Sequence, residues 1–257
     1  MTDALYLADP DLVGGAAVGQ SFTLAGEEGR HAVAVKRTRV GETVLVADGR
    51  GRALRLRVDS LAYQTLTGEV LEVRQDPEPR WTWRVVQGLA KGDRGDLSVE
   101  LLTEAGVHQL TAWQSQRSIV KWDAKAAKGL AKWQSTAREA AKQSRRARVP
   151  QVHPEVVNTR NLLAHLAEVR GMVLVAHEEA TSRLEDVDFP SSGPVTLLVG
   201  PEGGISPEEL ALLVSAGATP VLVSDGVLRA STAGAVALVQ MQLLARLQHG
   251  QQAEEGA

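Results

Sequence analysis

Three strand-like apolar runs in this sequence each lead directly into a loop of small or turn-forming residues. Glycines at positions 200, 203 and 204 let the backbone come close to a ligand and offer it N–H and C=O groups. In open α/β sheets, ligands bind outside the carboxyl ends of the strands, where such loops meet. The alternative is that the glycine run is only a tight strand-to-helix turn ahead of Ser206. The runs are Val173–Val175 before 176–178, Leu197–Val199 before 200–204, and Val221–Val223 before 224–226.

Other kinds of site find little support. No GxGxxG follows a strand-like run, and GLAKGDRGD (88–96) lacks the glycine spacing and the Lys-Ser/Thr pair of a phosphate-binding loop. The chain has no cysteine, and its six histidines show no HExxH spacing, so we predict no disulfide and no metal site. The N-terminal segment lacks the pattern of a signal peptide, and no apolar run reaches about 18 residues. We therefore expect a cytoplasmic protein without membrane segments.

The first 75 residues alternate short β-like runs with turns, which predicts a small all-β domain. Within one run, Leu54, Leu56 and Val58 alternate with Arg55 and Arg57, so one face would pack inward while the arginines project outward. This alternation predicts a basic β-surface. The runs are 21–26, 41–51, 53–64 and 66–75.

Two prolines, Pro77 and Pro79, interrupt the pattern, and we place the boundary between domains 1–75 and 76–250 there. Beyond it, strand-like and helix-like segments alternate, which is typical of an α/β fold with a parallel sheet. Ser206, Pro207 and Glu209 form the N-cap, first position and capping-box glutamate of a helix. The tail 251–257 is expected to be disordered. The expected strands are 81–90, 107–113, 172–178, 195–204 and 219–226, and the expected helices are 93–105, about 124–146, 159–169, 206–216 and 231–247.

The net charge of -3 hides a segregation of charge along the chain. Residues 76–150 carry 14 Lys/Arg against 8 Asp/Glu, whereas residues 151–257 carry 5 against 13. Two windows, 30–57 and 115–148, hold eight and ten basic residues with only two acidic residues each. The basic residues of either window could line a phosphate-binding face. The alternative is that they form only a solvated helix face or strand edge.

Several motifs together resemble those of a known family. LLVGPEGGISPEEL (197–210) and VLRASTAGAVAL (227–238) are similar to the two cofactor-binding signatures of the RsmE methyltransferases. The order of the other motifs follows the same family, and the resemblance covers nearly all of residues 5–247. These motifs are HAVAVKRTRVGETVLVADGRG (31–51), AKGDRGDLSVELLTEAGV (90–107), SQRSIVKW (115–122) and KWQSTAREAAKQSRRARVPQV (132–152).

The resemblance implies a SPOUT-type parallel sheet with a C-terminal trefoil knot at 76–250, preceded by a PUA-like β-barrel that binds RNA. Knots are almost absent from proteins, so this expectation comes from the resemblance alone. The family resemblance also implies a homodimer with each active site near the subunit interface. The implied activity uses S-adenosyl-L-methionine to methylate N3 of a uridine in 16S ribosomal RNA, on the small ribosomal subunit.

The resemblance also implies roles for individual residues. Arg229 would stabilise negative charge on the uracil oxygens as N3 loses its proton, unless it is only a helix-start arginine paired with an acidic neighbour. Glu202 would accept a proton or orient its loop. The implied cofactor contacts are Ala176, His177, Val199, Gly200, Pro201, Glu202, Gly203, Gly204, Ser224, Val227, Leu228, Arg229, Ser231, Thr232 and Ala233. The implied RNA contacts are His31, Arg37, Arg39, Arg50, Arg52, Lys91, Arg94, Arg117, Arg145 and Arg146.

Three positions depart from the family pattern. The segment 223–229 loses one arginine and gains Asp225, which affects the loop expected to hold adenosine. Ser231 stands where a glutamate is common, so that position cannot supply a general base, and Arg145 replaces an expected glycine. These departures keep two alternatives open, namely a SPOUT methyltransferase for another RNA position and a non-catalytic RNA-binding or ribosome-assembly factor.

Overall fold

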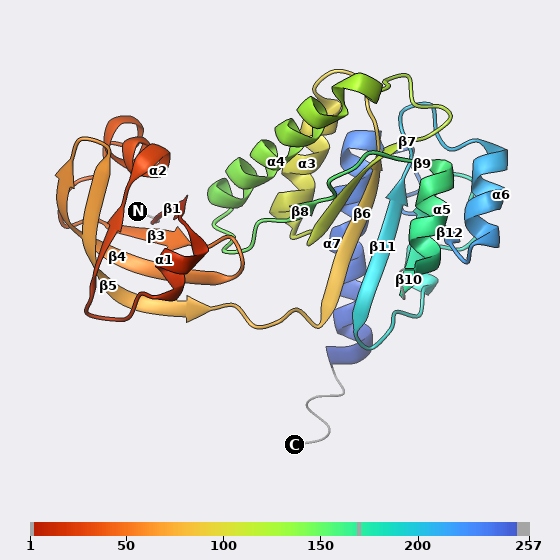
Figure 1. Cartoon of the computed structure of the whole chain (residues 1–257). Coiled ribbons are helices and arrows are strands. Elements are labelled where there is room, and N and C mark those ends of the chain that lie inside the picture. The colour runs from red at the N-terminus through yellow and green to blue at the C-terminus, as the bar shows by residue number, and fades with distance from the viewer. Residues whose placement is uncertain (1–2, 169–170, 251–257) are drawn as a thin grey trace. The chain divides into compact units, whose positions relative to one another are not determined.

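The computed structural model describes residues 3–168 and 171–250 and divides into two compact units (Figure 1). The first unit comprises the residues up to Glu78 together with Arg138–Val149. The second comprises Pro79–Ala137 and the residues from Pro150 onward. Because 138–149 belong to the first unit, the two units differ from the contiguous domains 1–75 and 76–250 that we expect from the sequence. The tail 251–257 lies outside the described residues.

The first unit is built on a five-stranded sheet in the order β1-β3-β4-β5-β2. Its pairs are antiparallel except β1 with β3, which is parallel. Two short helices and a π-helical turn also belong to this unit, so the expectation of an all-β domain is incomplete. The elements are β1 (Ala4–Leu7), α1 (Pro10–Gly14), β2 (Ser21–Leu24), α2 (Gly26–Arg30), the turn His31–Val35, β3 (Thr43–Ala47), β4 (Arg52–Ala62) and β5 (Thr65–Gln75).

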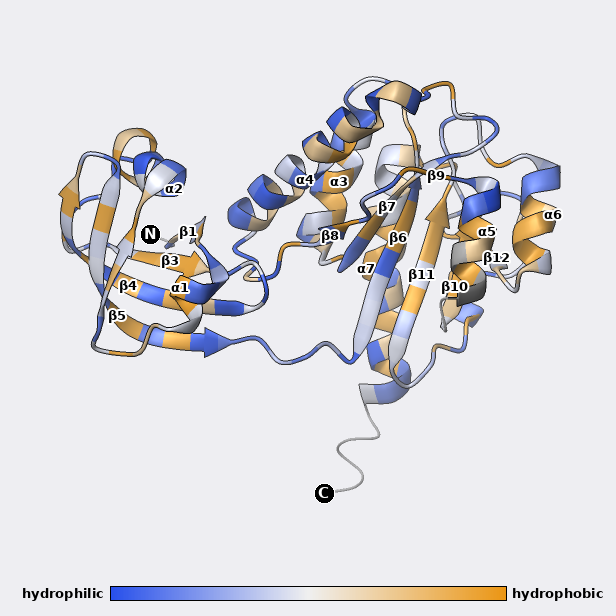
Figure 2. Cartoon of the chain, viewed as in Figure 1, coloured by the Kyte–Doolittle hydropathy of each residue, from blue (hydrophilic) through white to orange (hydrophobic). Residues whose placement is uncertain are grey.

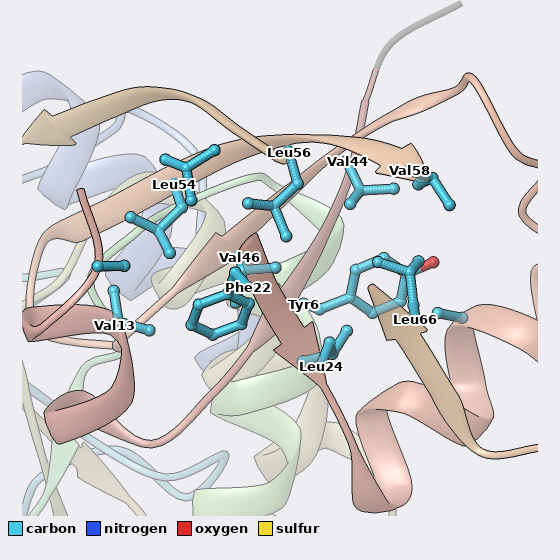
Figure 3. Close-up of a cluster of buried hydrophobic side chains, with 13 residues drawn as sticks. Tyr6, Val13, Phe22, Leu24, Val44, Val46, Leu54, Leu56, Val58 and Leu66 are labelled. Atoms are coloured by element: carbon cyan, nitrogen blue, oxygen red, sulfur yellow. The ribbon is translucent and has the colours of Figure 1, made fainter. Parts of the chain in front are cut away.

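The predicted alternation in β4 is confirmed. Leu54, Leu56 and Val58 are buried with Tyr6 and Phe22 in the core that Figure 3 shows. The intervening arginines point away from this core, but each is held by a carboxylate. Arg55 Nε lies 2.8 Å from Asp3 Oδ2, and Arg57 Nη2 lies 2.5 Å from Glu69 Oε2. The basic β-surface is thus largely neutralised by its own neighbours.

The second unit is built on a seven-stranded sheet, and every strand pair in it is parallel. Six strands follow the order β12-β10-β11-β6-β7-β8, and β9 also pairs with β7. The predicted α/β class with a parallel sheet is confirmed. The strands are β6 (Trp81–Gly88), β7 (Gln109–Gln114), β8 (Gln151–Val152), β9 (Val157–Asn158), β10 (Met172–Ala176), β11 (Gly193–Val199) and β12 (Thr219–Val221).

Helices cover both faces of this sheet, as parallel sheets require (Figure 1). On one face, α5 and α6 bury Leu162, Leu166 and Leu213 against Val86 and Leu198 of the strands. Helix α7 packs on the other face and against α3, and the apolar end of β11 between these layers is orange in Figure 2. The helices are α3 (Arg94–Ala105), α5 (Thr159–Glu168), α6 (Pro207–Ser215) and α7 (Ala230–Gly250), with a 3-10 turn at Leu184–Asp186. Helix α4 (Ala126–Gln143, preceded by the 3-10 turn Asp123–Lys125) begins in this unit, and its residues from Arg138 onward belong to the first unit.

Candidate functional site

The carboxyl ends of three neighbouring strands bring the predicted ligand loops together. Strand β10 pairs with β11 on one side and with β12 on the other, and Ala176 is in register with both Val199 and Val221. All three strands run in the same direction, so the loops that follow them leave the sheet at one edge. This edge is where α/β sheets bind ligands.

A cavity of about 560 Å³ lies among these loops. Its size is within the range of small-molecule sites, roughly 300 to 1,000 Å³. A smaller neighbouring cavity of about 120 Å³ reaches Ser224 and Asp225. Ser231 and Thr232, in the first turn of α7, line neither of these two cavities. The predicted cofactor residues that line the larger one are Ala176, His177, Val199, Gly200, Pro201, Glu202, Gly203, Gly204, Val227, Leu228, Arg229 and Ala233.

Two glycines let the loop after β11 lie close to its neighbours. A Cβ placed on Gly203 would come within 3.0 Å of the Arg117 carbonyl oxygen. A Cβ on Gly88, at the end of β6, would come within 2.5 Å of the Pro201 nitrogen. Neither position tolerates a side chain without movement of the cavity wall. Gly88 was not predicted from the sequence, because its role depends on a contact with residues more than one hundred positions away.

Glu202 orients the loop that it belongs to. Its Oε1 accepts a hydrogen bond from the Lys91 backbone N–H at 3.0 Å and lies 4.0 Å from Arg94 Nη1. The same side chain also lines the cavity. The loop-orienting role is therefore present in the structure, and it places the Arg94 cation at the cavity wall.

Arg117 reaches the cavity from a short loop after β7. Its Nη1 donates to the Gly203 carbonyl at 3.2 Å. The loop is closed by Ser118, whose Oγ accepts the Ser115 N–H at 3.1 Å and whose N–H donates to the Ser115 carbonyl. The SQRS segment thus forms a defined turn that presents Arg117.

Glu209 holds this turn against α6. Ser206 is the N-cap of α6, as predicted, and its Oγ accepts the Glu209 N–H. The expected capping-box role of the Glu209 side chain is wrong, because its fully buried carboxylate binds elsewhere. Its Oε1 accepts the Gln116 N–H at 2.8 Å and the Thr159 hydroxyl. The residue preceding Arg117 is therefore tied to the first turn of α6, a link that sequence reasoning missed.

Arg229 lies at the start of α7 and lines the larger cavity. Its backbone carbonyl accepts N–H groups of Thr232 and Ala233, while its side chain is exposed. Within the described part of the chain, no carboxylate lies within ion-pair distance of its guanidinium. The alternative that Arg229 is a helix-start arginine held by an acidic neighbour therefore finds no support here. Asp225, which departs from the family pattern, forms an ion pair with Arg183 instead. The distance from Arg183 Nη1 to Asp225 Oδ1 is 2.9 Å.

Residues 77–242 match the RNA methyltransferase domain family. The chain is 45% identical over 224 residues, 86% of this chain and 85% of the relative, to Ribosomal RNA small subunit methyltransferase E of Mycobacterium bovis. The chain belongs to the ribosomal RNA small subunit methyltransferase E family. Another relative with this description, from Bacillus subtilis, is 29% identical over 90% of this chain and 93% of its own length. A crystal structure of the Neisseria gonorrhoeae protein of this family, bound to S-adenosyl methionine, superposes with a TM-score of 0.83 at 30% identity, covering 95% of this chain and 98% of that one.

The RNA contacts expected for this methyltransferase fall into two groups. Lys91, Arg94 and Arg117 belong to the second unit, and the last two line the cavity. The others belong to the first unit, where their environments differ. Arg52 is a structural residue, because its guanidinium donates to the Val13 and Ala16 carbonyls at the end of α1.

Four of the remaining predicted contacts of the first unit are exposed, whereas His31 and Arg146 are half-buried. Arg37 and Arg145 are exposed and adopt left-handed backbone conformations, with φ of 53° and 55°. Arg39 and Arg50 are also exposed, and their backbone N–H groups are held by Glu42 and Asp48 in local turns. His31 packs edge-on against Tyr6 with 6.1 Å between ring centroids. Burial lowers the pKa of the Arg146 guanidinium below its usual range.

Two further features of the methyltransferase concern the described residues only. No helix among them is long and apolar enough to cross a membrane. No cluster of three or more His, Cys, Asp or Glu side chains, among those that the structure describes, is arranged to hold a metal ion.

Proposed function

We propose that this protein transfers the methyl group of S-adenosyl-L-methionine to N3 of a uridine in 16S ribosomal RNA. The observation that carries the proposal is the 560 Å³ cavity at the strand ends, which is lined by most of the residues that the sequence motifs assign to the cofactor. Relatives named as small-subunit ribosomal RNA methyltransferases, and a neighbour bound to S-adenosyl methionine, support it. Uridine N3 follows from the motif resemblance. Such a substrate places the enzyme in the cytoplasm.

The residues of the cavity fit the cofactor. Loop 200–204 offers backbone N–H and C=O groups, and its glycines leave space that side chains would fill. Ala176, Val227 and Leu228 add apolar surface suited to an adenine ring. Ser224, at the smaller cavity, extends the same wall. S-adenosyl-L-methionine, when bound there, would supply an electrophilic sulfonium methyl group.

The three arginines that line the cavity are suited to binding the uridine and the negative charge that develops on it. Uracil N3 must lose a weakly acidic proton, and negative charge then develops on the neighbouring carbonyl oxygens. Arg229 has no competing carboxylate among the described residues, so its guanidinium is free to stabilise that charge. Arg94 and Arg117 are placed to hold phosphate or uracil oxygens by charge-assisted hydrogen bonds. Glu202 contributes mainly by fixing the loop and Arg94, and it lines the cavity as a candidate proton acceptor together with Glu178 and Glu179.

Other parts of the proposal concern architecture. We infer that the second unit contains the trefoil knot of the SPOUT class and that the first unit is a PUA-like RNA platform. We also infer a homodimer, because one surface of α7 with a neighbouring α3 residue exposes large apolar side chains. Such surfaces in soluble proteins mark interaction sites. The side chains are Leu97, Val236, Val239, Leu243 and Leu247, exposed by 41%, 37%, 52%, 49% and 59%.

Nucleoside analysis of ribosomal RNA by mass spectrometry, with and without the gene, tests the proposal. We expect 3-methyluridine to disappear from small-subunit RNA when the gene is absent, and to return with the natural gene but not with one encoding Arg229→Ala. Unchanged 3-methyluridine with loss of another mark would assign a different RNA position. Calorimetry with S-adenosyl-L-methionine provides the second test, since a protein that binds none would be an RNA-binding factor without turnover.

A further inference from the structure

A row of polar side chains crosses the middle of the second unit's sheet, far from the strand ends that form the cofactor cavity. Thr196 of β11, Arg84 of β6, Gln109 of β7 and Gln151 of β8 are in register on four neighbouring parallel strands. Side chains in register on parallel strands point to the same face. Thr196 is buried, Arg84 and Gln109 are half-buried, and Gln151 is exposed on the edge strand β8, so the row runs from the interior of the sheet to its edge.

The row lines a third cavity, of about 180 Å³, on the face of the sheet that α5 covers. Its residues are shared with neither cavity at the strand ends. The rest of its wall combines apolar residues, among them Leu166 of α5, with two polar ones. These residues are Val86, Leu110, Val152, Pro154 and Leu166, together with Thr111 and His153. The volume corresponds to about six water molecules at about 30 Å³ each. The space is therefore larger than a single-water site and smaller than a typical nucleotide or drug site.

Two polar groups at the centre of the row have no partner in the protein. Arg84 Nε is buried and donates to no acceptor, and the buried Thr196 hydroxyl likewise has none. Among the side chains that the structure describes, no carboxylate lies within 4 Å of the Arg84 guanidinium to form an ion pair. A guanidinium stays charged at any physiological pH. Arg84 is half-buried and its charge has no counter-ion at the wall of the cavity, so an anion bound there would gain charge-assisted hydrogen bonds.

We propose that this cavity is a binding site for a small oxyanion, a carboxylate or a phosphate group carried by a compact molecule. Arg84 would bind two oxygens of the anion through parallel N–H donors. The Thr196 hydroxyl would donate to the same group, while the apolar wall at Leu166 would contact a short hydrocarbon body. Because no residue of the methyl-transfer site takes part, the proposal is independent of the proposed function.

The test is thermal unfolding of the full chain in a chloride buffer, with inorganic phosphate, acetate or benzoate added at matched ionic strength. A ligand that binds only the folded state raises the melting temperature with its concentration. We expect a rise with at least one of these anions. It should disappear in Arg84→Met and weaken in Thr196→Val, but persist in Arg117→Met, which removes a cation from the other cavity. Without added anion, Arg84→Met should melt at the same temperature as the natural protein or higher, because an unpaired, half-buried charge is replaced by an apolar chain.

The pattern of response identifies the ligand chemistry. A rise with phosphate alone indicates a phosphate group, and a rise with acetate or benzoate alone indicates an organic acid. The proposal is overturned if no anion acts beyond the chloride control, or if Arg84→Met responds as the natural protein does. If Arg84→Met fails to fold, Thr196→Val and a crystal grown with the active anion decide the question, and an Arg84 side chain contacting only water would reject the site.

Discussion

Glu209 offers the sharpest test of how the fold positions the arginines of the proposed active site. Its buried carboxylate binds the Gln116 N–H and the Thr159 hydroxyl, and Gln116 precedes Arg117 in the chain. A second link joins the same elements, since the Ser206 hydroxyl donates to Gln116 Oε1 at 2.9 Å. We therefore predict that Glu209 positions Arg117 through the backbone of the SQRS turn, without itself touching the substrate.

The structure sets the size of the effect. Glu209→Leu removes a charged acceptor from two donors, and hydrogen bonds to charged groups contribute about 1.5 to 3 kcal/mol each. The free energy of unfolding should thus fall by about 3 to 5 kcal/mol. Glu209→Gln keeps an acceptor oxygen in the same place and loses only the charge, so a cost of about 1 to 2 kcal/mol is expected.

Single-turnover methylation, alongside cofactor titration, separates positioning from stability. At a temperature where all variants are folded, Glu209→Leu should slow methyl transfer by about 10-fold or more, and Glu209→Gln should restore most of the rate. Cofactor affinity should change little in either variant. The deciding measurement is a double-mutant cycle with Arg117→Ala. If Glu209 acts through Arg117, removing both should cost about as much as removing Arg117 alone, and fully additive losses would refute the argument.

Three other predictions address the cavity and the first unit. Arg229→Ala should reduce single-turnover methylation by about 100-fold or more while cofactor affinity, measured by calorimetry, changes little. Gly88→Ala should weaken cofactor binding by at least about 10-fold in the same titration, because its Cβ would press on the Pro201 nitrogen, 2.5 Å away. Lys142→Met should lower the free energy of unfolding, measured by urea denaturation, by about 3 to 5 kcal/mol. The substitution removes the ammonium that lies 2.9 Å from the Glu28 carboxylate, and adding Glu28→Leu should recover most of the lost stability.

The elements of the second unit could be predicted because their signals are local. Parallel strands are buried on both faces, so β10 and β11 appear as continuous apolar runs. Helix α6 begins at the predicted Ser206 cap, and α7 follows the predicted segment with one to three extra residues at its ends. Strands β8 and β9 were missed because each has only two residues. Strand β1 was missed because its four residues pair in parallel with β3, a contact that no local pattern announces.

The site could be predicted only where sequence order determines position. Loops after consecutive parallel strands must meet at one sheet edge, which is why segment 200–204 was found. Gly88 and Glu209 instead work through residues about one hundred positions away, so no spacing rule reveals them. The one available signal for Glu209 was its place in the first turn of a capped helix, and that signal also fits a capping box. Local chemistry allows both a capping box and a link to the SQRS turn, and the tertiary contacts of Glu209 make the link to the SQRS turn.

The number of charges in a sequence window does not predict which cations are available to bind a phosphate, because ion pairs within the protein occupy some of them. The cavity combines Arg229 from the acidic last third with Arg94 and Arg117 from the basic middle third. Five of the other cations of the basic windows are already bound by carboxylates within their own unit, so these five add little attraction for RNA. Local pairing, more than net charge, therefore determines which arginines remain available to the substrate. The paired cations are Arg55, Arg57, Lys132, Lys142 and Arg148.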